Sequence, residues 1–577
     1  MTGLPSPSIL LGTPSKENWY PGQEKAFSGI MDWISTSSRF LGVSAPTGSG
    51  KTILALLTAR FSGQRTCILT ATKGLMDQYM RDALPLGGVT VRGQNNFRCT
   101  LVPILTADEG PCHEGLSCSF SRSGGCSYRE QLRRSLDAQI VITNYAYYLA
   151  QTRFSTGLGV FGLIILDEAH SSFGALENHL TVYLDRLSIE SIGLQFPSLP
   201  TSEIFSKDNI RKSKKKEPAK VANSPVDGST DSPADDPATT DAITQPDLWA
   251  QWQSWASCSA PIAQEYTEKL ATEVRELHEK ESPVPGALSR SYRSAKSTLA
   301  KLQSLSSSSG DWIIEQVHHG IRFTPRWVAD KGAALFQNVP KIMLMSAILS
   351  HKTADSIGVP VGADRTWLEV GSYFPPQNTP IYHIPTARIN YHSDDYATTI
   401  WQARIDQIIQ RRLDRKGIIF TVSYDRARFL LSRSRYKDIM LTHSTGDVTV
   451  VVDRFKRADP PKVLVSPTVT TGWDFPMIES GHGKPQYIIV GKVPWPDTKD
   501  LVLQARHEDD KDWSSYLAME TLIQETGRCS RGFDDKCEIF VIDDNITWYL
   551  WNFKHFAPKW FMERWHGSLT CVPDPML

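Results

Sequence analysis

Short aliphatic runs recur along the chain, separated by stretches whose apolar residues follow the period of an amphipathic helix. Runs of this length, bounded by polar residues, predict strands that are buried on both faces of a parallel sheet. Nine of them are RFLGVSA, RTCILTA, QIVITNY, LIILDEA, KIMLMSA, KGIIFTV, KVLVSPT, YIIVGKV and CEIFVID. This alternation predicts an α/β fold, in which ligands bind beyond the carboxyl ends of the strands. The loops after these strands are therefore the expected location of a functional site.

The middle of the chain departs from this pattern. The segment 206–247 has no aromatic residue and few aliphatic ones, so it cannot bury enough apolar surface to order itself and is predicted to be a disordered loop. Its basic run RKSKKK, at 211–216, is compatible with nucleic-acid contact or a nuclear signal, but the pattern favours a solvated tether.

A polar, helix-like stretch follows from Leu248 to about Lys331, and no strands are expected in it. Trp249, Trp252 and Trp255 recur there at helical spacing. Such a stripe could stack on bases, but it is more typical of side chains packed in a core.

Composition and charge narrow the class of protein. A chain of 577 residues is too long for one core, and about 150 residues per domain suggests roughly four domains. The 62 Lys and Arg balance the 62 Asp and Glu, so nucleic acid would have to bind at a local basic surface. The start of the chain does not resemble a secretion signal, and the run VFGLIIL, at 160–166, is too short to cross a bilayer. We therefore expect a cytoplasmic protein without a membrane contact, whose thiols stay reduced.

A phosphate-binding loop follows the first of the predicted strands. The sequence APTGSGKT, Ala45–Thr52, precedes a helical stretch. Backbone N–H groups at Gly48, Ser49 and Gly50 would close around phosphates at a helix N-terminus. Lys51 would contact the β- and γ-phosphates, and the Thr52 hydroxyl would be a ligand of Mg²⁺. The motif predicts ATP and Mg²⁺ as cofactors.

Two further motifs supply groups for phosphate chemistry. The strand LIIL ends in DEAH, where Asp167 suits Mg²⁺ and Glu168 suits orientation or deprotonation of the attacking water, although a DE pair can also cap a helix. In QETGRCSRG, the residues Gln524, Arg528 and Arg531 have the spacing of one helix face. That face could carry surface ion pairs, but paired arginines also suit the charge on a transferring γ-phosphate. Together the motifs predict a site split between two α/β domains, with hydrolysis coupled to their opening and closing.

These motifs resemble superfamily 2 helicases, and the details are similar to the XPD/DinG family of iron–sulfur DNA helicases. WYPGQEKAF resembles the adenine-side motif, with Gln23 as the base contact, and RTCILTATKGLMDQYMRDA resembles motif Ia, with Thr72 and Gln78 near the DNA backbone. VITNYAYYL, GIIFTVSYDRA and VGKVPWP resemble further family elements, and SPTVTTGWDFP resembles motif V, with Gly472 and Asp474. PKIMLMSAILS resembles motif III but has Ile348 where the family has threonine, a change that could weaken unwinding and leave ATPase activity intact.

The resemblance implies two RecA-like parallel-sheet motor domains, an inserted Fe–S domain and a helical arch domain. The first motor domain would comprise residues 1–93, 135–171 and 331–360. The Fe–S domain would be 94–134, the arch 172–330 and the second motor domain 361–577.

Four of the nine cysteines lie close together in the Fe–S segment. Cys99, Cys112, Cys118 and Cys126 are separated by twelve, five and seven residues. Structural zinc sites usually contain tighter pairs, whereas an Fe–S cluster accepts irregular spacing. The resemblance implies a [4Fe–4S] cluster on these cysteines; zinc, a Cys3His site with His113, disulfides and no metal remain alternatives. The remaining cysteines, Cys67, Cys258, Cys529, Cys537 and Cys571, are expected to be packing residues.

The implied activity is that of an ATP-dependent DNA helicase with 5′→3′ polarity, acting as a monomer on single-stranded and forked DNA. Its partners would be other proteins of a repair, recombination or defence complex. It would be nucleoid-associated in a bacterium or phage, and a nuclear location stays open. The alternatives are a DNA-stimulated translocase without strong unwinding, an ATP-switched nucleic-acid-binding subunit and, on the DEAH box alone, an RNA helicase.

Overall fold

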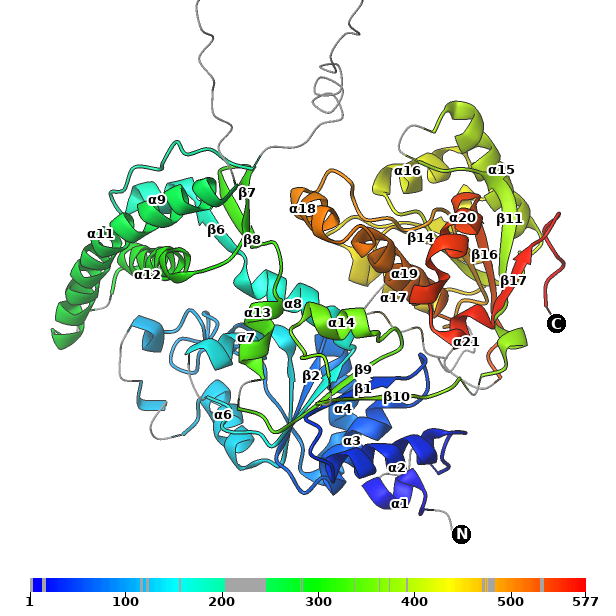
Figure 1. Cartoon of the computed structure of the whole chain (residues 1–577). Helices are drawn as coiled ribbons and strands as arrows, with labels where there is room; N and C mark the ends of the chain where they lie inside the picture. Colours follow the sequence, from blue (N-terminus) through cyan, green and yellow to red (C-terminus); the bar gives the residue numbers. More distant parts are fainter. Residues whose placement is uncertain are drawn as a thin grey trace, which may run out of the picture.

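The chain forms two α/β lobes and a separate helical arm (Figure 1). The computed structural model describes residues 4–12, 17–114, 118–120, 124–154, 157–202, 245–280, 282, 284–336, 338–362, 364–372, 374–390, 393–469, 473, 475, 483–529 and 534–576. Gly472, Asp474, Arg531 and most of the loop expected at 206–247 lie outside these residues.

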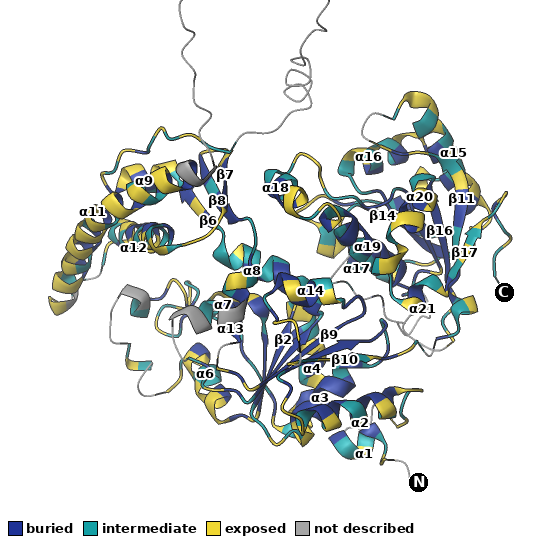
Figure 2. Ribbon diagram, viewed as in Figure 1, coloured by how far each residue is buried: buried dark blue, intermediate teal, exposed yellow. Residues whose placement is uncertain are grey.

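The first lobe is built on a parallel sheet of seven strands. Its order is β10-β1-β9-β5-β2-β4-β3. The strands are β1 (Phe40–Ser44), β2 (Thr66–Thr70), β3 (Val89–Thr90), β4 (Ile140–Asn144), β5 (Leu163–Asp167), β9 (Lys341–Ser346) and β10 (Arg365–Glu369). Alternate strand residues form two apolar clusters, one with α2 (Gln23–Ile34), α3 (Lys51–Phe61) and α4 (Lys73–Ala83), the other with α7 (Tyr145–Phe154) and α8 (Ser172–Leu180). The buried strands stand out at the centre of the lobe in Figure 2.

A second parallel sheet of seven strands forms the other lobe. Its order is β13-β14-β12-β15-β16-β11-β17. The strands are β11 (Ile381–Ala387), β12 (Lys416–Phe420), β13 (Met440–Leu441), β14 (Lys462–Ser466), β15 (Tyr487–Val490), β16 (Glu538–Asp543) and β17 (Trp565–Ser568). One face packs on α15 (Asp395–Gln410) and α16 (Tyr424–Arg433), the other on α17 (Val448–Arg457), α19 (Trp513–Thr526) and α20 (Asn545–Phe553). All nine predicted strands are present, and the α/β fold with two RecA-like domains is confirmed.

The helical arm joins a long helix pair to a small antiparallel sheet. It contains β6 (Val182–Asp185), α9 (Arg186–Ser191), α11 (Gln245–Glu279), α12 (Gly286–Ser307), β7 (Trp312–Val317) and β8 (Gly320–Pro325), with the strand order β6-β8-β7. Trp249 stacks on Trp312 at 5.1 Å between ring centroids, and Trp252 is buried against Phe323. The expectation that the tryptophan stripe is core packing is therefore confirmed.

The expectation that this part of the chain contains no strands is wrong. Strands β7 and β8 lie in the stretch from Leu248 to Lys331, where none was expected. Their turn has His318 and His319 in place of the Asn-Gly or Asp-Gly pair that marks a tight hairpin in a sequence.

The boundary expected at residue 360 is also wrong, because β10 pairs with β1 and belongs to the first motor sheet. β10 is a half-exposed edge strand without a long aliphatic run, so its sequence pattern is weak. Its Trp367 ring occupies the space beside Gly42, where an added Cβ atom would lie 2.4 Å from the ring. No helix in the described part of the chain is long and apolar enough to span a membrane.

Candidate active site

The phosphate-binding loop leads from β1 directly into α3. Gly50 caps α3 with a left-handed backbone, at φ 78°, which glycine adopts without strain. Gln23 lies against the loop: its Nε2 donates to the carbonyl oxygens of Ser49 at 3.4 Å and Gly50 at 3.3 Å. An added Cβ atom on Gly50 would lie 2.3 Å from that amide, so a glycine is required for this close approach.

The side chain of Lys51 folds back into this loop. Its Nζ donates to the carbonyl oxygens of Ala45 at 3.2 Å and Pro46 at 3.3 Å, and the residue is buried. The ammonium group therefore lies at the concave side of the loop, where anionic oxygens would replace the two carbonyls as its partners.

Asp167 is buried at the carboxyl end of β5. Its Oδ1 accepts from the Glu168 backbone N–H at 3.0 Å, and its Oδ2 accepts from the Tyr79 hydroxyl at 2.9 Å. Burial raises the pKa of Asp167 to about 7, the charge of Glu168 adds to the increase, and Lys51 opposes it. Lys51 is therefore near enough to Asp167 for its charge to stabilise the carboxylate. A divalent cation beside Asp167 and Glu168 would suit these two acidic residues.

His170 connects this site to two other segments. Its Nδ1 lies 2.8 Å from Ser346 Oγ at the end of β9 and 3.5 Å from Glu168 Oε2. On the other side of the ring, Nε2 lies 3.4 Å from Gln524 Nε2 on α19 of the second lobe. Burial lowers the pKa of His170, which favours the neutral imidazole as a link between the two lobes.

The turn that carries Arg528 in the second lobe lies beside the phosphate-binding loop. Arg528 donates from Nη2 to Gln524 Oε1 at 3.2 Å and from Nη1 to the Trp473 carbonyl at 2.6 Å. An added Cβ atom on Gly527 would lie 3.3 Å from Thr47 Oγ1, so this turn touches the loop of the first lobe. The contact between Arg528 and Gln524 agrees with their i, i+4 spacing, although α19 ends at Thr526 and Gly527, a poor helix former, caps it.

Comparison with known proteins identifies these two lobes. Residues 20–198 match the DEAD/DEAH box helicase family, and residues 408–564 match a helicase C-terminal domain. The chain belongs to the XPD/DinG-like helicases of superfamily 2. No curated protein matches its sequence significantly.

Solved XPD structures share the fold of this helicase. One described as an XPD helicase is 15% identical, with a TM-score of 0.60, and the match covers 95% of this chain and 99% of the other. An XPD apo structure is 15% identical, with a TM-score of 0.56 and coverage of 92% and 98%. Xpd4 of S. tokodaii is 14% identical, with a TM-score of 0.55 and coverage of 96% and 100%. Helicases of this family hydrolyse ATP with Mg²⁺ and bind nucleic acid.

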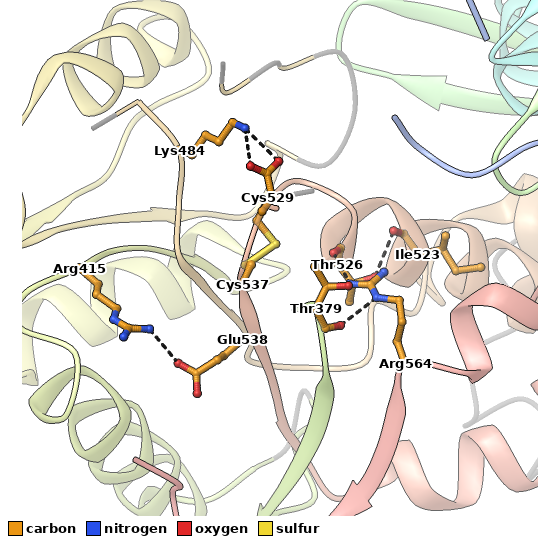
Figure 3. The surroundings of a disulfide bond; sticks show 10 residues. Thr379, Arg415, Lys484, Ile523, Thr526, Cys529, Cys537, Glu538 and Arg564 are labelled. Atoms are coloured by element: carbon orange, nitrogen blue, oxygen red, sulfur yellow. Dashed lines mark hydrogen bonds and ion pairs between the residues drawn. A yellow bond between two sulfur atoms is a disulfide. The ribbon is translucent and has the colours of Figure 1, made fainter. Parts of the chain in front are cut away.

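A disulfide lies directly after the arginine of the helicase's second lobe (Figure 3). It joins Cys529 to Cys537, so these two cysteines are not simple packing residues as expected. Cys258 and Cys571 are exposed, which also contradicts that expectation, whereas Cys67 is fully buried and agrees with it. Cys529 follows the end of α19 and Cys537 directly precedes β16, so the disulfide joins these two elements.

Arg564 holds the end of α19 next to this disulfide (Figure 3). The side chain is buried, and its Nη2 and Nε donate to the carbonyl oxygens of Thr526 at 3.1 Å and Thr379 at 2.9 Å. Burial lowers its pKa to about 10, so the guanidinium remains charged at neutral pH. A positive charge at the carboxyl end of a helix is favourable, and here it fixes the turn that carries Arg528.

The four clustered cysteines share one region of the inserted segment. Burial raises the pKa of Cys112, and Cys118, Cys99 and Cys126 each add to the increase, so all four thiols lie within electrostatic range. Within the described residues, no three His, Cys, Asp or Glu side chains already form a metal-binding group. Four thiols supplied by one segment nevertheless have the donor chemistry of an Fe–S cluster.

Sequence reasoning missed two tyrosines that contact Asp167. Tyr79 binds its carboxylate, and the Tyr145 hydroxyl donates to its backbone carbonyl at 2.8 Å. Both phenols are buried, and their partners lie far away in the sequence. Tyr79 lies in the motif Ia segment, and Tyr145 directly follows Asn144. Neither position indicated a role at Asp167.

Proposed function

We propose that this helicase uses ATP and Mg²⁺ to translocate along single-stranded DNA in the 5′→3′ direction and to unwind duplex DNA. The observation that carries the proposal is the contact of segments from the two lobes at the phosphate-binding loop and the DEAH segment. The turn of Arg528 lies against Thr47 of the phosphate-binding loop, and Gln524 of the second lobe lies 3.4 Å from His170 of the DEAH segment.

The residues around this contact have complementary tasks in hydrolysis. The backbone of Gly48, Ser49 and Gly50 and the ammonium of Lys51 bind the phosphates, while Gln23 contacts the adenine. Thr52 and Asp167 would hold Mg²⁺, which would supply neutralisation of the phosphate charge. Glu168 orients and deprotonates the attacking water. Arg528, with Arg531 as its expected companion, stabilises the charge that develops on the γ-phosphate.

Hydrolysis is coupled to movement through contacts between the lobes. His170 lies within 2.8 Å of Ser346 and 3.4 Å of Gln524, so a change at the DEAH segment displaces groups on both lobes. Motif V, with Gly472 and Asp474, would complete the cleft on the side of the second lobe. Separating a base-pair step costs about 1.4 kcal/mol on average, so a small motion per ATP suffices to advance a fork.

We further infer that Cys99, Cys112, Cys118 and Cys126 hold a [4Fe–4S] cluster. The support is that one segment supplies four thiols and that Cys118, Cys99 and Cys126 lie near enough to Cys112 to raise its pKa. The cluster would cross-link the inserted segment and make it rigid beside the DNA. Anaerobically purified protein should contain about four irons and absorb broadly near 400 nm. A colourless protein with stoichiometric zinc would overturn this assignment.

The substitution Lys51→Ala tests the nucleotide site. It should abolish ATP hydrolysis and the unwinding of a forked duplex together, because the phosphates lose their main cation. Lys559→Ala is the control, since that lysine is highly exposed and pairs only with Glu563, 3.9 Å away on the same helix turn. Strand separation that persists in the Lys51→Ala protein would contradict the proposed site.

A second candidate is a translocase that hydrolyses ATP on DNA without strong unwinding. Ile348 favours it, because motif III lacks the family's threonine hydroxyl. A DNA-stimulated ATPase assay run beside a forked-duplex assay distinguishes the two activities. Negligible stimulation by DNA would instead indicate an ATP-switched binding subunit.

A further inference from the structure

Tyr79 contacts the side chain of Asp167, one of the two residues that suit Mg²⁺. Its hydroxyl donates to Asp167 Oδ2 at 2.9 Å. The tyrosine is 0% exposed, so no water competes for this bond. The phenol therefore joins α4 to the acidic end of β5.

The choice of partner argues against a purely structural role for this tyrosine. A buried hydroxyl needs a hydrogen bond, and a backbone carbonyl satisfies it, as the Asp167 carbonyl does for Tyr145. Tyr79 instead binds a carboxylate oxygen, while Glu168 N–H binds the other oxygen. The two donors fix the rotation of the carboxylate and leave each oxygen with a lone pair for a cation or its bound water.

The helix that carries Tyr79 also connects this carboxylate to the protein surface. α4 begins after Thr72, whose side chain accepts from the Leu75 backbone N–H and caps the helix. Gln78, the neighbour of Tyr79, is exposed on the other side of α4. A displacement of α4 by a ligand at its exposed side would move the phenol, and with it the carboxylate.

We propose that Tyr79 is a positioning residue for the magnesium–nucleotide complex, holding the Asp167 carboxylate in the orientation that the metal requires. This inference rests on the proposed ATPase function and adds a residue to it. Groups that orient a metal ligand commonly change metal affinity 10- to 100-fold when they are removed, and the loss of one hydrogen bond belongs at about the lower end of that range.

The substitution Tyr79→Phe tests the proposal, because it removes one oxygen and keeps the ring in the core. Binding of a fluorescent ATP analogue is measured while Mg²⁺ is titrated, and again in EDTA. The Mg²⁺ concentration for half-maximal binding should rise about tenfold, and the affinity in EDTA should stay within twofold. The rise in ATPase rate on adding single-stranded DNA should shrink as well.

Tyr487→Phe is the matched control. Tyr487 is also fully buried, and its hydroxyl has no hydrogen-bond partner among the described residues. Its loss should leave the Mg²⁺ titration unchanged.

Three results would contradict the inference or its basis. An unchanged Mg²⁺ titration for Tyr79→Phe would make Tyr79 a packing residue. A parallel loss of affinity with Mg²⁺ and in EDTA would mean that the substitution disturbs the phosphate-binding loop itself, which also overturns the positioning role. Absence of magnesium-dependent nucleotide binding in the unsubstituted protein would overturn the proposed function instead.

Discussion

Arg506 joins the second motor domain to α8 of the first lobe and to the end of β8 in the arm, and its replacement by methionine should open this contact locally. It lies on α18 (Leu501–Asp509) and is 3% exposed. Its Nη1 lies 2.8 Å from Glu177 Oε2 on α8, and its Nε and Nη2 donate to the carbonyl oxygens of Arg326 at 2.6 Å and Pro325 at 3.1 Å. The guanidinium also lies 4.7 Å from the centroid of the Phe173 ring.

The free-energy cost of Arg506→Met follows from the acceptors that lose their hydrogen-bond donor. Methionine fills similar space on the aromatic ring but leaves the Glu177 carboxylate and two carbonyl oxygens without a donor. Removing one partner of a buried ion pair costs about 3–5 kcal/mol. The Glu177 side chain is 26% exposed and regains some water, so the lower end, about 3 kcal/mol, is expected. That free energy corresponds to a rise of roughly 100-fold in the local opening constant.

Hydrogen exchange followed by mass spectrometry measures this opening. Peptides from α18 and α8 should exchange much faster in the Arg506→Met protein, while peptides from the central strands β12 and β15 should not change. Glu177→Gln, which keeps an oxygen acceptor, should cost only about 1 kcal/mol. Exchange of the α18 peptides within twofold of the unsubstituted protein would refute the reasoning, because the ion pair would then contribute nothing to domain contact.

Three other perturbations give separate outcomes. Burial raises the pKa of Glu520 from 4.5 to about 8, so its contribution to stability is complete below pH 4.5, falls as the pH rises and is lost above pH 8; Glu520→Gln should therefore flatten the decline of the denaturation midpoint between these pH values. Arg564→Met removes the donor to the Thr526 carbonyl, which holds the turn that carries Arg528, so kcat for ATP should fall while the dissociation constant of the nucleotide stays unchanged. Cys529 and Cys537 should resist alkylation until a reductant is added, whereas the exposed Cys258 and Cys571 should react at once; equal labelling of all four would contradict the disulfide.

The strands that sequence predicted best are those buried on both faces. A strand such as β5 needs apolar side chains at every position, and this requirement is visible as a continuous run. Edge strands such as β10 and β17 bury only some of their residues, so their sequences resemble loops. Likewise, β7 and β8 could not be recognised because their hairpin lacks a standard turn pair and their apolar residues pack on a distant helix.

The residues of the candidate site also differ in how far the sequence predicts them. The phosphate-binding loop and the DEAH segment are short and continuous, so their residue types and spacing predict their chemistry locally. Tyr79 and its acceptor Asp167 are 88 residues apart, and Arg564 and the Thr379 carbonyl are 185 apart. No spacing rule links such pairs, because only the packing of helices on a sheet brings them together.

The structure gives the departure in motif III a physical meaning. Ser346, the first residue of the motif's Ser-Ala-Ile-Leu sequence, contacts His170 of the DEAH segment. Ile348 is 5% exposed and belongs, with Ala347, to the apolar cluster of the second motor domain. Opening the cleft would return this side chain to water at a cost of about 1.5–3 kcal/mol, a cost that a threonine hydroxyl would largely avoid. Burial of the isoleucine therefore favours the closed arrangement of the lobes. Opening should then be slower than in a helicase with threonine at this position, and the proposed strand separation, which would need repeated opening, should be the activity most sensitive to it.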